Sequence, residues 1–185
     1  MLEEAKEYFG MGFRALKIKT GRNIEQDIEC VSKLSNFFGH SMRIRVDANQ
    51  GYNIKELFQF LDAAEKLKIE LIEQPLPTGM EKELLAIPYK FRKILVADES
   101  LIDEDSAIYL KKIGSPYGVY NIKLMKCGGI QAANKIQWIA YESDCKLFWG
   151  CNDESLISIT AALHAAYSCI NTKYLDLDGL SLIHI

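Results

Sequence analysis

The chain has 185 residues, of which 49% are hydrophobic and 25% are charged, and its formal net charge is −3. These values are ordinary for a globular protein, and the slight acidity without a basic stripe gives no reason to expect a nucleic-acid partner. The chain contains no uninterrupted apolar run that approaches membrane-spanning length, and its acidic, amphipathic beginning does not resemble a signal peptide. We therefore expect a cytoplasmic protein that binds neither nucleic acid nor a membrane.

The cysteines and histidines indicate neither a disulfide framework nor a zinc site. There are five cysteines and no C-x-x-C pair, which favours reduced thiols. The three histidines include no pair at helical spacing, so the sequence does not favour a zinc site.

Helical and strand-like segments alternate along the chain. A helical pattern at 2–9 has no strand before it. Seven short apolar runs are then typical of strands, at 14–19, 43–47, 69–73, 94–98, 118–123, 146–150 and 173–178. Helices are predicted at 24–38, 57–67, 103–112, 130–143 and 154–168, and Asn53 with Glu56 has the chemistry of a capping box before the second of these.

This alternation, without any linker, favours an α/β fold with parallel strands in one continuous domain, residues 1–179. Seven strands after an unaccompanied helix suit a partial (β/α)8-type, TIM-like barrel in which strands 2–8 are present and the first is missing. A doubly wound open sheet is the alternative, but its phosphate-binding G-x-G-x-x-G turn is absent.

Charged residues recur where the apolar runs end, 25 to 28 residues apart. They are Lys19, Asp47, Glu73, Asp98 and Lys123. A charge at the carboxyl end of several barrel strands is typical of a catalytic site. One βα unit takes about this much chain, so the spacing indicates a repeating unit with its charges at one end.

The three carboxylates of Asp47, Glu73 and Asp98 could converge on one Mg²⁺, which prefers hard oxygen ligands. Any one of them alone is more simply a solvated residue at a strand end, and only the regular spacing favours a common site. Lys19 and Lys123 would then flank this trio, and Lys17 would share the face of Lys19. A lysine acts as a base only if desolvation or nearby positive charge lowers its pKa. The alternative is an edge strand with solvated lysines.

The motifs in this order resemble the barrel domain of the enolase superfamily, in its muconate-lactonising subgroup. They are K-x-K at Lys17 and Lys19, VDANQGY with Asp47 and Asn49, IEQPL with Glu73, ADES with Asp98 and Glu99, and NIKLMKCGGI with Lys123. The resemblance implies one Mg²⁺ held by the three carboxylates, which stabilises the ene-diolate of a carboxylate substrate. It also implies that Lys19 and Lys123 act as acid and base on opposite faces, that Lys17 tunes Lys19, and that Asn49 and Glu99 orient ligands.

Two bases on opposite faces suit racemisation or epimerisation, but the same pair also supports cycloisomerisation or dehydration. Near the end of the chain, Asp176 and Asp178 form a D-x-D pair that resembles the dipeptide epimerases, where it receives the substrate ammonium group. We therefore expect an L-Ala-D/L-Glu-type epimerase or a relative with another dipeptide preference. Muconate cycloisomerase, o-succinylbenzoate synthase and N-acylamino acid racemase are the alternatives. Asn152 and Asp153 depart from the more usual sequence of this group.

The resemblance covers only the barrel, because the N-terminal capping domain of the family's complete enzymes is not recognised here. We therefore expect the chain to be an inactive fragment without appreciable turnover, and a non-catalytic folding unit is the interpretation from a different class. Residues 180–185, LSLIHI, could be encoded by DNA that resembles a sequencing adapter, which predicts a non-native tail. Whether the parent protein is homo-oligomeric is left open.

Overall fold

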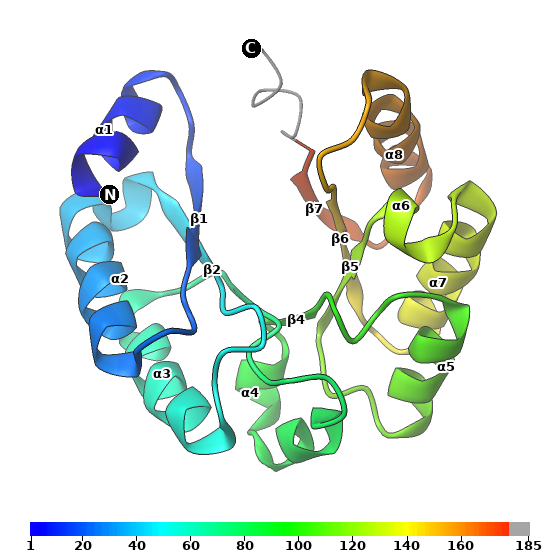
Figure 1. Ribbon diagram of the computed structural model, residues 1–185, viewed down its shortest axis with the longest axis horizontal. Helices are drawn as coiled ribbons and strands as arrows, with labels where there is room; N and C mark the ends of the chain where they lie inside the picture. The colour runs from blue at the N-terminus through cyan, green and yellow to red at the C-terminus, as the bar shows by residue number, and fades with distance from the viewer. Residues whose placement is uncertain (178–185) are drawn as a thin grey trace. The chain divides into compact units, whose positions relative to one another are not determined.

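The computed structural model describes residues 1–177 as alternating helices and strands (Figure 1). The chain divides into two compact units, Met1–Leu95 and Val96–Ile185. The second unit is described as far as residue 177.

The first unit contains three parallel strands in the order β1-β2-β3. Its elements are α1 (Leu2–Gly10), β1 (Ala15–Lys19), α2 (Ile24–Phe38), η1 (Gly39–Ser41), β2 (Arg43–Asp47), α3 (Ile54–Leu67), β3 (Leu71–Glu73), η2 (Glu81–Ala86) and α4 (Tyr89–Arg92). In the sheet register Lys19 is opposite Asp47, and Asp47 is opposite Glu73. The carboxyl ends of the three strands therefore form one edge.

The second unit repeats this arrangement with parallel pairs β4–β5, β5–β6 and β6–β7. Its elements are β4 (Leu95–Ala97, which begins at the unit boundary), α5 (Glu104–Lys112), β5 (Val119–Ile122), α6 (Leu124–Cys127), α7 (Ile130–Glu142), β6 (Lys146–Gly150), α8 (Leu156–Ser168) and β7 (Thr172–Asp176). The register of β6 and β7 shifts between Leu147 and Phe148.

Local side-chain chemistry explains where several helices begin. The Asn53 side chain accepts hydrogen bonds from the backbone of Lys55 and Glu56, while the Glu56 carboxylate accepts one from the backbone of Asn53. Asp103 and Ser106 form a second capping box at the start of α5. These bonds satisfy N–H groups that have no partner within the helix.

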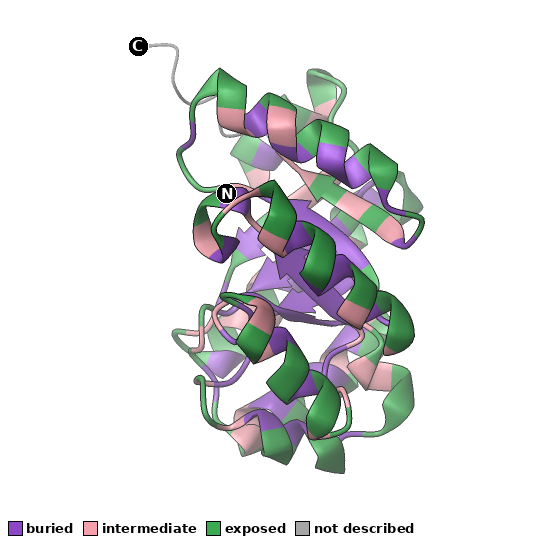
Figure 2. Ribbon diagram, turned by 90° about the vertical axis from the view of Figure 1, so that its right-hand side faces the viewer, coloured by how far each residue is buried: buried purple, intermediate pink, exposed green. Residues whose placement is uncertain are grey.

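The strands β2 to β6 consist mostly of buried residues, while the helices alternate between buried and exposed positions (Figure 2). Parallel strands covered on both faces have this continuous apolar pattern. In the first unit Val31 and Leu34 of α2, and Leu57 and Leu61 of α3, are each at most 1% exposed. The apolar stripes of these helices thus cover the strands.

The predicted segments 24–38, 43–47 and 146–150 agree with the structure, and the other predicted bounds shift by one to three residues. The strand predicted at 118–123 ends at Ile122, and Lys123 is instead the N-cap of α6. The strand predicted to reach Asp178 ends at Asp176. Asp178 and the predicted tail 180–185 lie outside the described residues. The single domain 1–179 stays a prediction.

Two features bear on the environment of the chain. Within residues 1–177, no helix combines the length and the apolar character needed to cross a membrane. All five cysteines are free thiols, and burial raises the pKa of the Cys145 thiol to about 12.

We predict that Asn53→Ala lowers the free energy of unfolding by about 1 kcal/mol, because it removes the capping box of α3. Chemical denaturation followed by circular dichroism measures this change. Lys55→Ala, on the exposed neighbour in the same turn, is the matched control. Equal unfolding midpoints for the two variants would contradict the role of the cap.

Candidate active site

The edge formed by β1, β2 and β3 carries buried carboxylates that are paired with lysines. Asp47 and Glu73 are 2% and 1% exposed. The Lys19 Nζ donates to Asp47 Oδ2 at 2.6 Å, and the Lys17 Nζ lies 3.8 Å from Glu73 Oε2. Burying a carboxylate is costly unless a cation or hydrogen-bond donors accompany it. The two lysines of β1 therefore neutralise the ends of the two neighbouring strands.

The alternation of β1 puts both lysines on one face. Lys17 and Lys19 are exposed, and Ile18 between them is buried. Successive side chains of a strand point to opposite faces, so residues two apart share a face. The shared face that the sequence predicted is confirmed by the ion pairs of the two lysines with the strand-end carboxylates.

Asn49 links Lys19 to the carboxylate of Asp47. Its Oδ1 accepts a hydrogen bond from Lys19 Nζ at 2.9 Å, and its backbone N–H donates to Asp47 Oδ1 at 3.0 Å. Asn49 has φ 42° and Gln50 has φ 68°, in the left-handed region of backbone conformation that residues other than glycine rarely adopt. This turn brings the backbone of Asn49 back to the carboxylate that ends β2.

The loops after β2 and β3 run side by side and continue the sheet bonding. Gln50 N–H donates to the carbonyl of Gln74 at 2.8 Å, and Tyr52 N–H donates to that of Pro75 at 3.0 Å. Gln74 is fully buried with φ 33°, and its Nε2 donates to the carbonyl of Leu76 at 2.9 Å. Backbone strain of this kind persists only where the surroundings fix the conformation. The backbone that follows Glu73 is thus fixed by the loop after β2 and by the hydrogen bond within its own loop.

The loops after β1 and β2 are in direct backbone contact. A Cβ on Gly51 would lie 2.1 Å from the carbonyl oxygen of Gly21, which leaves no room for a side chain. Asp27 of α2 accepts hydrogen bonds from Gly21 N–H at 2.8 Å and from Tyr52 Oη at 3.0 Å. Burial raises the pKa of Tyr52, which keeps its hydroxyl protonated as a donor.

In the second unit, one carboxylate lies between two lysines. Asp98, 5% exposed, follows β4. Its Oδ2 accepts a hydrogen bond from Lys123 Nζ at 2.7 Å, and its Oδ1 accepts one from Lys126 Nζ at 2.5 Å. Burial alone would raise the pKa of Asp98, but the charges of Lys126 and Lys123 outweigh this effect and hold the pKa below its ordinary value.

Sequence reasoning missed Lys126. The signal was present as the second lysine of NIKLMK, three residues after Lys123, because residues three apart lie on one side of a helical turn. The spacing that selected the other charged residues follows strand ends, and Lys126 lies on the short helix α6 instead.

The remaining predicted site residues lie in the second unit. Glu99 is half-buried beside Asp98. Asp176 ends β7, is half-buried, and its carbonyl accepts a weak hydrogen bond from Cys151 Sγ at 3.5 Å. Asn152 and Asp153 are exposed in the loop before α8, where Asn152 N–H donates to Glu154 Oε1 at 3.0 Å. Asp178, the other member of the D-x-D pair, is not among the described residues.

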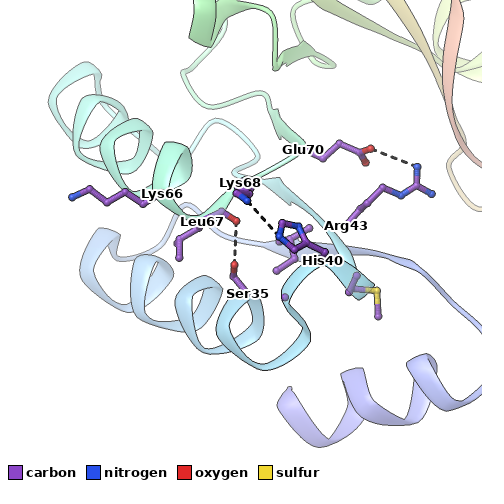
Figure 3. A pocket seen from close by; sticks show the side chains of 10 residues that line it. Ser35, His40, Arg43, Lys66, Leu67, Lys68 and Glu70 are labelled. Atoms are coloured by element: carbon purple, nitrogen blue, oxygen red, sulfur yellow. Dashed lines mark hydrogen bonds and ion pairs between the residues drawn. The ribbon is translucent and has the colours of Figure 1, made fainter.

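A cavity of about 270 Å³ lies at the opposite ends of the strands, where β2 and β3 begin (Figure 3). In it Lys68 Nζ lies 3.4 Å from His40 Nε2, and Arg43 forms an ion pair with Glu70 at 3.6 Å. Cations are stabilised near the C-termini of helices, and α2 and α3 both end here. The basic lining is thus explained by the helix ends, and the cavity is separate from the carboxylate edge of the same unit.

The carboxylate set fits a divalent cation in its chemistry. Asp47, Glu73 and Asp98 are hard oxygen donors, each is buried, and each is already accompanied by an ammonium group. A cation that binds oxygen ligands could take over that neutralising role. Within residues 1–177 the structure shows no group of three or more His, Cys, Asp or Glu side chains arranged to hold a metal ion. Asp47 and Glu73 belong to the first unit, and Asp98 belongs to the second.

Comparison with known proteins shows which family the chain resembles in sequence and in fold. The family model Enolase C-terminal domain-like matches residues 1–181. An L-Lys-D/L-Arg epimerase of Desulforapulum autotrophicum is 47% identical over 178 residues, which are 96% of this chain and 50% of that protein. An L-Ala-D/L-Glu epimerase of Clostridium acetobutylicum is 37% identical over 184 residues, covering 97% of this chain and 50% of that protein.

A crystal structure of a dipeptide epimerase from Methylococcus capsulatus, complexed with Mg and the dipeptide L-Arg-D-Lys, has a TM-score of 0.93 and 45% sequence identity. The match covers 96% of this chain and 50% of that one. The chain thus spans about half the length of these relatives. The predicted α/β fold and the family resemblance are confirmed.

We predict that Gly51→Ala destabilises the chain, because the added Cβ collides with the backbone of Gly21. A thermal unfolding scan should show a Tm loss of several degrees, since overpacking costs about 1–3 kcal/mol. Gly10→Ala, at the end of α1 where nothing lies within 4 Å of the new Cβ, is the matched control and should leave the Tm unchanged or higher. A Gly51→Ala variant as stable as Gly10→Ala would refute the close contact of the two loops.

Proposed function

Because the chain belongs to the Enolase C-terminal domain-like family, we propose that the protein carrying it is a magnesium-dependent epimerase of dipeptides. The observation that carries the proposal is the register of Lys19, Asp47 and Glu73, which brings a lysine and two buried carboxylates to one edge of the sheet. In the second unit, Asp98 and Lys123 pair one buried carboxylate with a lysine.

In the proposed site, Asp47, Glu73 and Asp98 hold Mg²⁺. Their burial and their hard oxygen donors support this assignment. Bound there, the ion would stabilise the negative charge that develops on a substrate carboxylate when its α-proton is removed.

Lys19 and Lys123 transfer the protons in this proposal. Lys19 Nζ now donates to Asp47 Oδ2 and to Asn49 Oδ1. Asn49 would hold Lys19 in place when Asp47 serves as a ligand of the ion. A neutral Lys19 then takes the α-proton from one face of the substrate, and a protonated Lys123 returns a proton to the other face. Because the proton leaves from one face and another arrives on the opposite face, the stereocentre inverts. One proton is removed and one is added, so the composition of the substrate does not change.

Two further residues have supporting roles in the proposed reaction. Lys17, beside Glu73, contributes a positive charge to the edge on which the substrate carboxylate would bind. Glu99, next to Asp98, orients that ligand. Asp176 at the end of β7 offers a carboxylate to the substrate ammonium group, together with Asp178.

Among dipeptides, we propose those with cationic side chains as the first substrates to test. The identity of 47% to an L-Lys-D/L-Arg epimerase, against 37% to an L-Ala-D/L-Glu epimerase, supports this preference. The L-Ala-D/L-Glu type expected from the motifs is the alternative.

The test, made on the full-length protein that carries this chain, is the exchange of a dipeptide α-proton with solvent deuterium, followed by NMR with and without Mg²⁺. We expect exchange with L-Lys-L-Arg that needs Mg²⁺ and exceeds the exchange with L-Ala-L-Glu. Lys19→Ala and Lys123→Ala should each abolish exchange from one stereoisomer selectively, since each lysine serves one face.

Lys33→Ala is the matched control for this experiment, because Lys33 forms an exposed pair with Glu29 on α2. It should exchange both stereoisomers like the unchanged protein. Racemisation of an N-acylamino acid without exchange of either dipeptide would show that the dipeptide assignment is wrong.

A further inference from the structure

The ammonium group of Lys126 is enclosed by three oxygen atoms. Its Nζ donates to Asp98 Oδ1 at 2.5 Å, to the Asp98 carbonyl at 2.8 Å and to the Asn121 carbonyl at 3.0 Å. The side chain is 14% exposed. An ammonium has three N–H donors and no acceptor, so these three bonds use its full hydrogen-bonding capacity.

Two of the three acceptors are main-chain carbonyls, and they fix where the charge of Lys126 lies. The Asn121 carbonyl belongs to β5, and the Asp98 carbonyl follows β4. These strands are hydrogen-bonded neighbours. Lys126 therefore ties together the carboxyl ends of both strands at the point where the Asp98 side chain begins. An exposed surface pair has no such anchoring and contributes little.

Lys123 and Lys126 divide the Asp98 carboxylate between them. Lys123 is the N-cap of the one-turn helix α6, and Lys126 follows three residues later in the same turn. Each approaches a different oxygen, Lys123 the Oδ2 and Lys126 the Oδ1. The structure thus places two lysines beside one carboxylate, and their proximity to Asp98 does not by itself say which of them moves protons.

We propose that Lys126 is a positioning residue, a fixed counter-ion that holds the Oδ1 side of Asp98 in place while Lys123 carries the proton. The proposal rests on the proposed function for the role of Lys123, whereas the positioning of Asp98 by Lys126 rests on the three bonds alone. The three N–H donors of Lys126 all point to protein oxygens, so none of them is directed at a substrate. Its hydrogen bond to Oδ1 and its two bonds to main-chain carbonyls keep the Asp98 carboxylate oriented.

The first test is thermal unfolding of the 185-residue chain. Lys126→Met keeps the length of the side chain but removes the three hydrogen bonds that Lys126 donates to Asp98 Oδ1 and two carbonyls. We expect the Tm to fall by on the order of 10 °C, as for breaking a buried ion pair. Lys135→Met removes an exposed lysine that pairs with Glu104 and is the matched control, with a Tm within about 2 °C of the unchanged chain.

A double-mutant cycle with Asp98→Asn shows whether the loss passes through Asp98. If Lys126 acts on the carboxylate, Lys126→Met should cost much less in the Asp98→Asn background than alone. Lys126→Arg, which keeps a cation, should recover most of the Tm. A full Tm loss in both backgrounds, or a Lys126→Met variant no less stable than Lys135→Met, would overturn the proposal. This experiment measures no activity, so its outcome is separate from that of the proposed function.

The second test uses deuterium exchange from the two stereoisomers of a dipeptide, in the protein that carries this chain. A residue that positions Asp98 affects both faces alike, so Lys126→Met and Lys126→Arg should lower exchange from both isomers by the same factor. Lys123→Ala should instead abolish exchange from one. Loss of exchange from a single isomer in either Lys126 variant would make Lys126 the proton carrier and overturn the proposal. Lys126→Arg keeps this comparison accessible if Lys126→Met does not fold.

Discussion

A carboxylate that is removed from water at the end of a strand needs a cation beside it, and this requirement governs both units of the chain. The carboxylates that end β2 and β3 and follow β4 are at most 5% exposed, so water does not compensate their charge. The cation beside Asp47 is Lys19, and the cation beside Glu73 is Lys17. Asp98 has two, Lys123 and Lys126. The loops that follow the strands are shaped accordingly, with left-handed backbone at Asn49, Gln50 and Gln74.

The same requirement gives the edge its chemical versatility. An ammonium group that neutralises a buried carboxylate is held by Coulomb attraction, and a second cation can compete for that position. A metal ion that binds Asp47 would therefore compete with Lys19 for this carboxylate. Lys126 differs from Lys19 because two of its three acceptors are main-chain carbonyls. A cation that binds the Asp98 carboxylate would leave these two hydrogen bonds of Lys126 in place. Two lysines that each pair with a buried carboxylate thus differ in their other acceptors and in exposure, which is 65% for the Lys19 side chain and 14% for that of Lys126.

The sequence predicted the parts of this architecture that depend on local rules. Asn53 and Glu56 are three residues apart, and their capping box formed as expected because both partners lie in one helical turn. Strand 43–47 was predicted from its apolar run, which long-range packing preserves. The helices η2, α4 and α6 were missed because six or fewer residues are too short for an apolar periodicity to show. Lys126 was missed for a different reason: it lies on α6 and not at a strand end, and its acceptors, which belong to β5 and to the residue after β4, are brought together only by tertiary structure.

The register of the first three strands also determines which sequence changes the edge can tolerate. Neighbouring strands lie about 4.8 Å apart, so the hydrogen bonding of the sheet fixes the spacing between the backbones of Lys19, Asp47 and Glu73. Loops and helices on the outside can lengthen or shorten without altering this spacing. A single residue inserted within β2 would instead turn the Asp47 side chain to the other face of the sheet. Over evolutionary time, insertions should therefore accumulate between the strands of such a fold and be purged from within them.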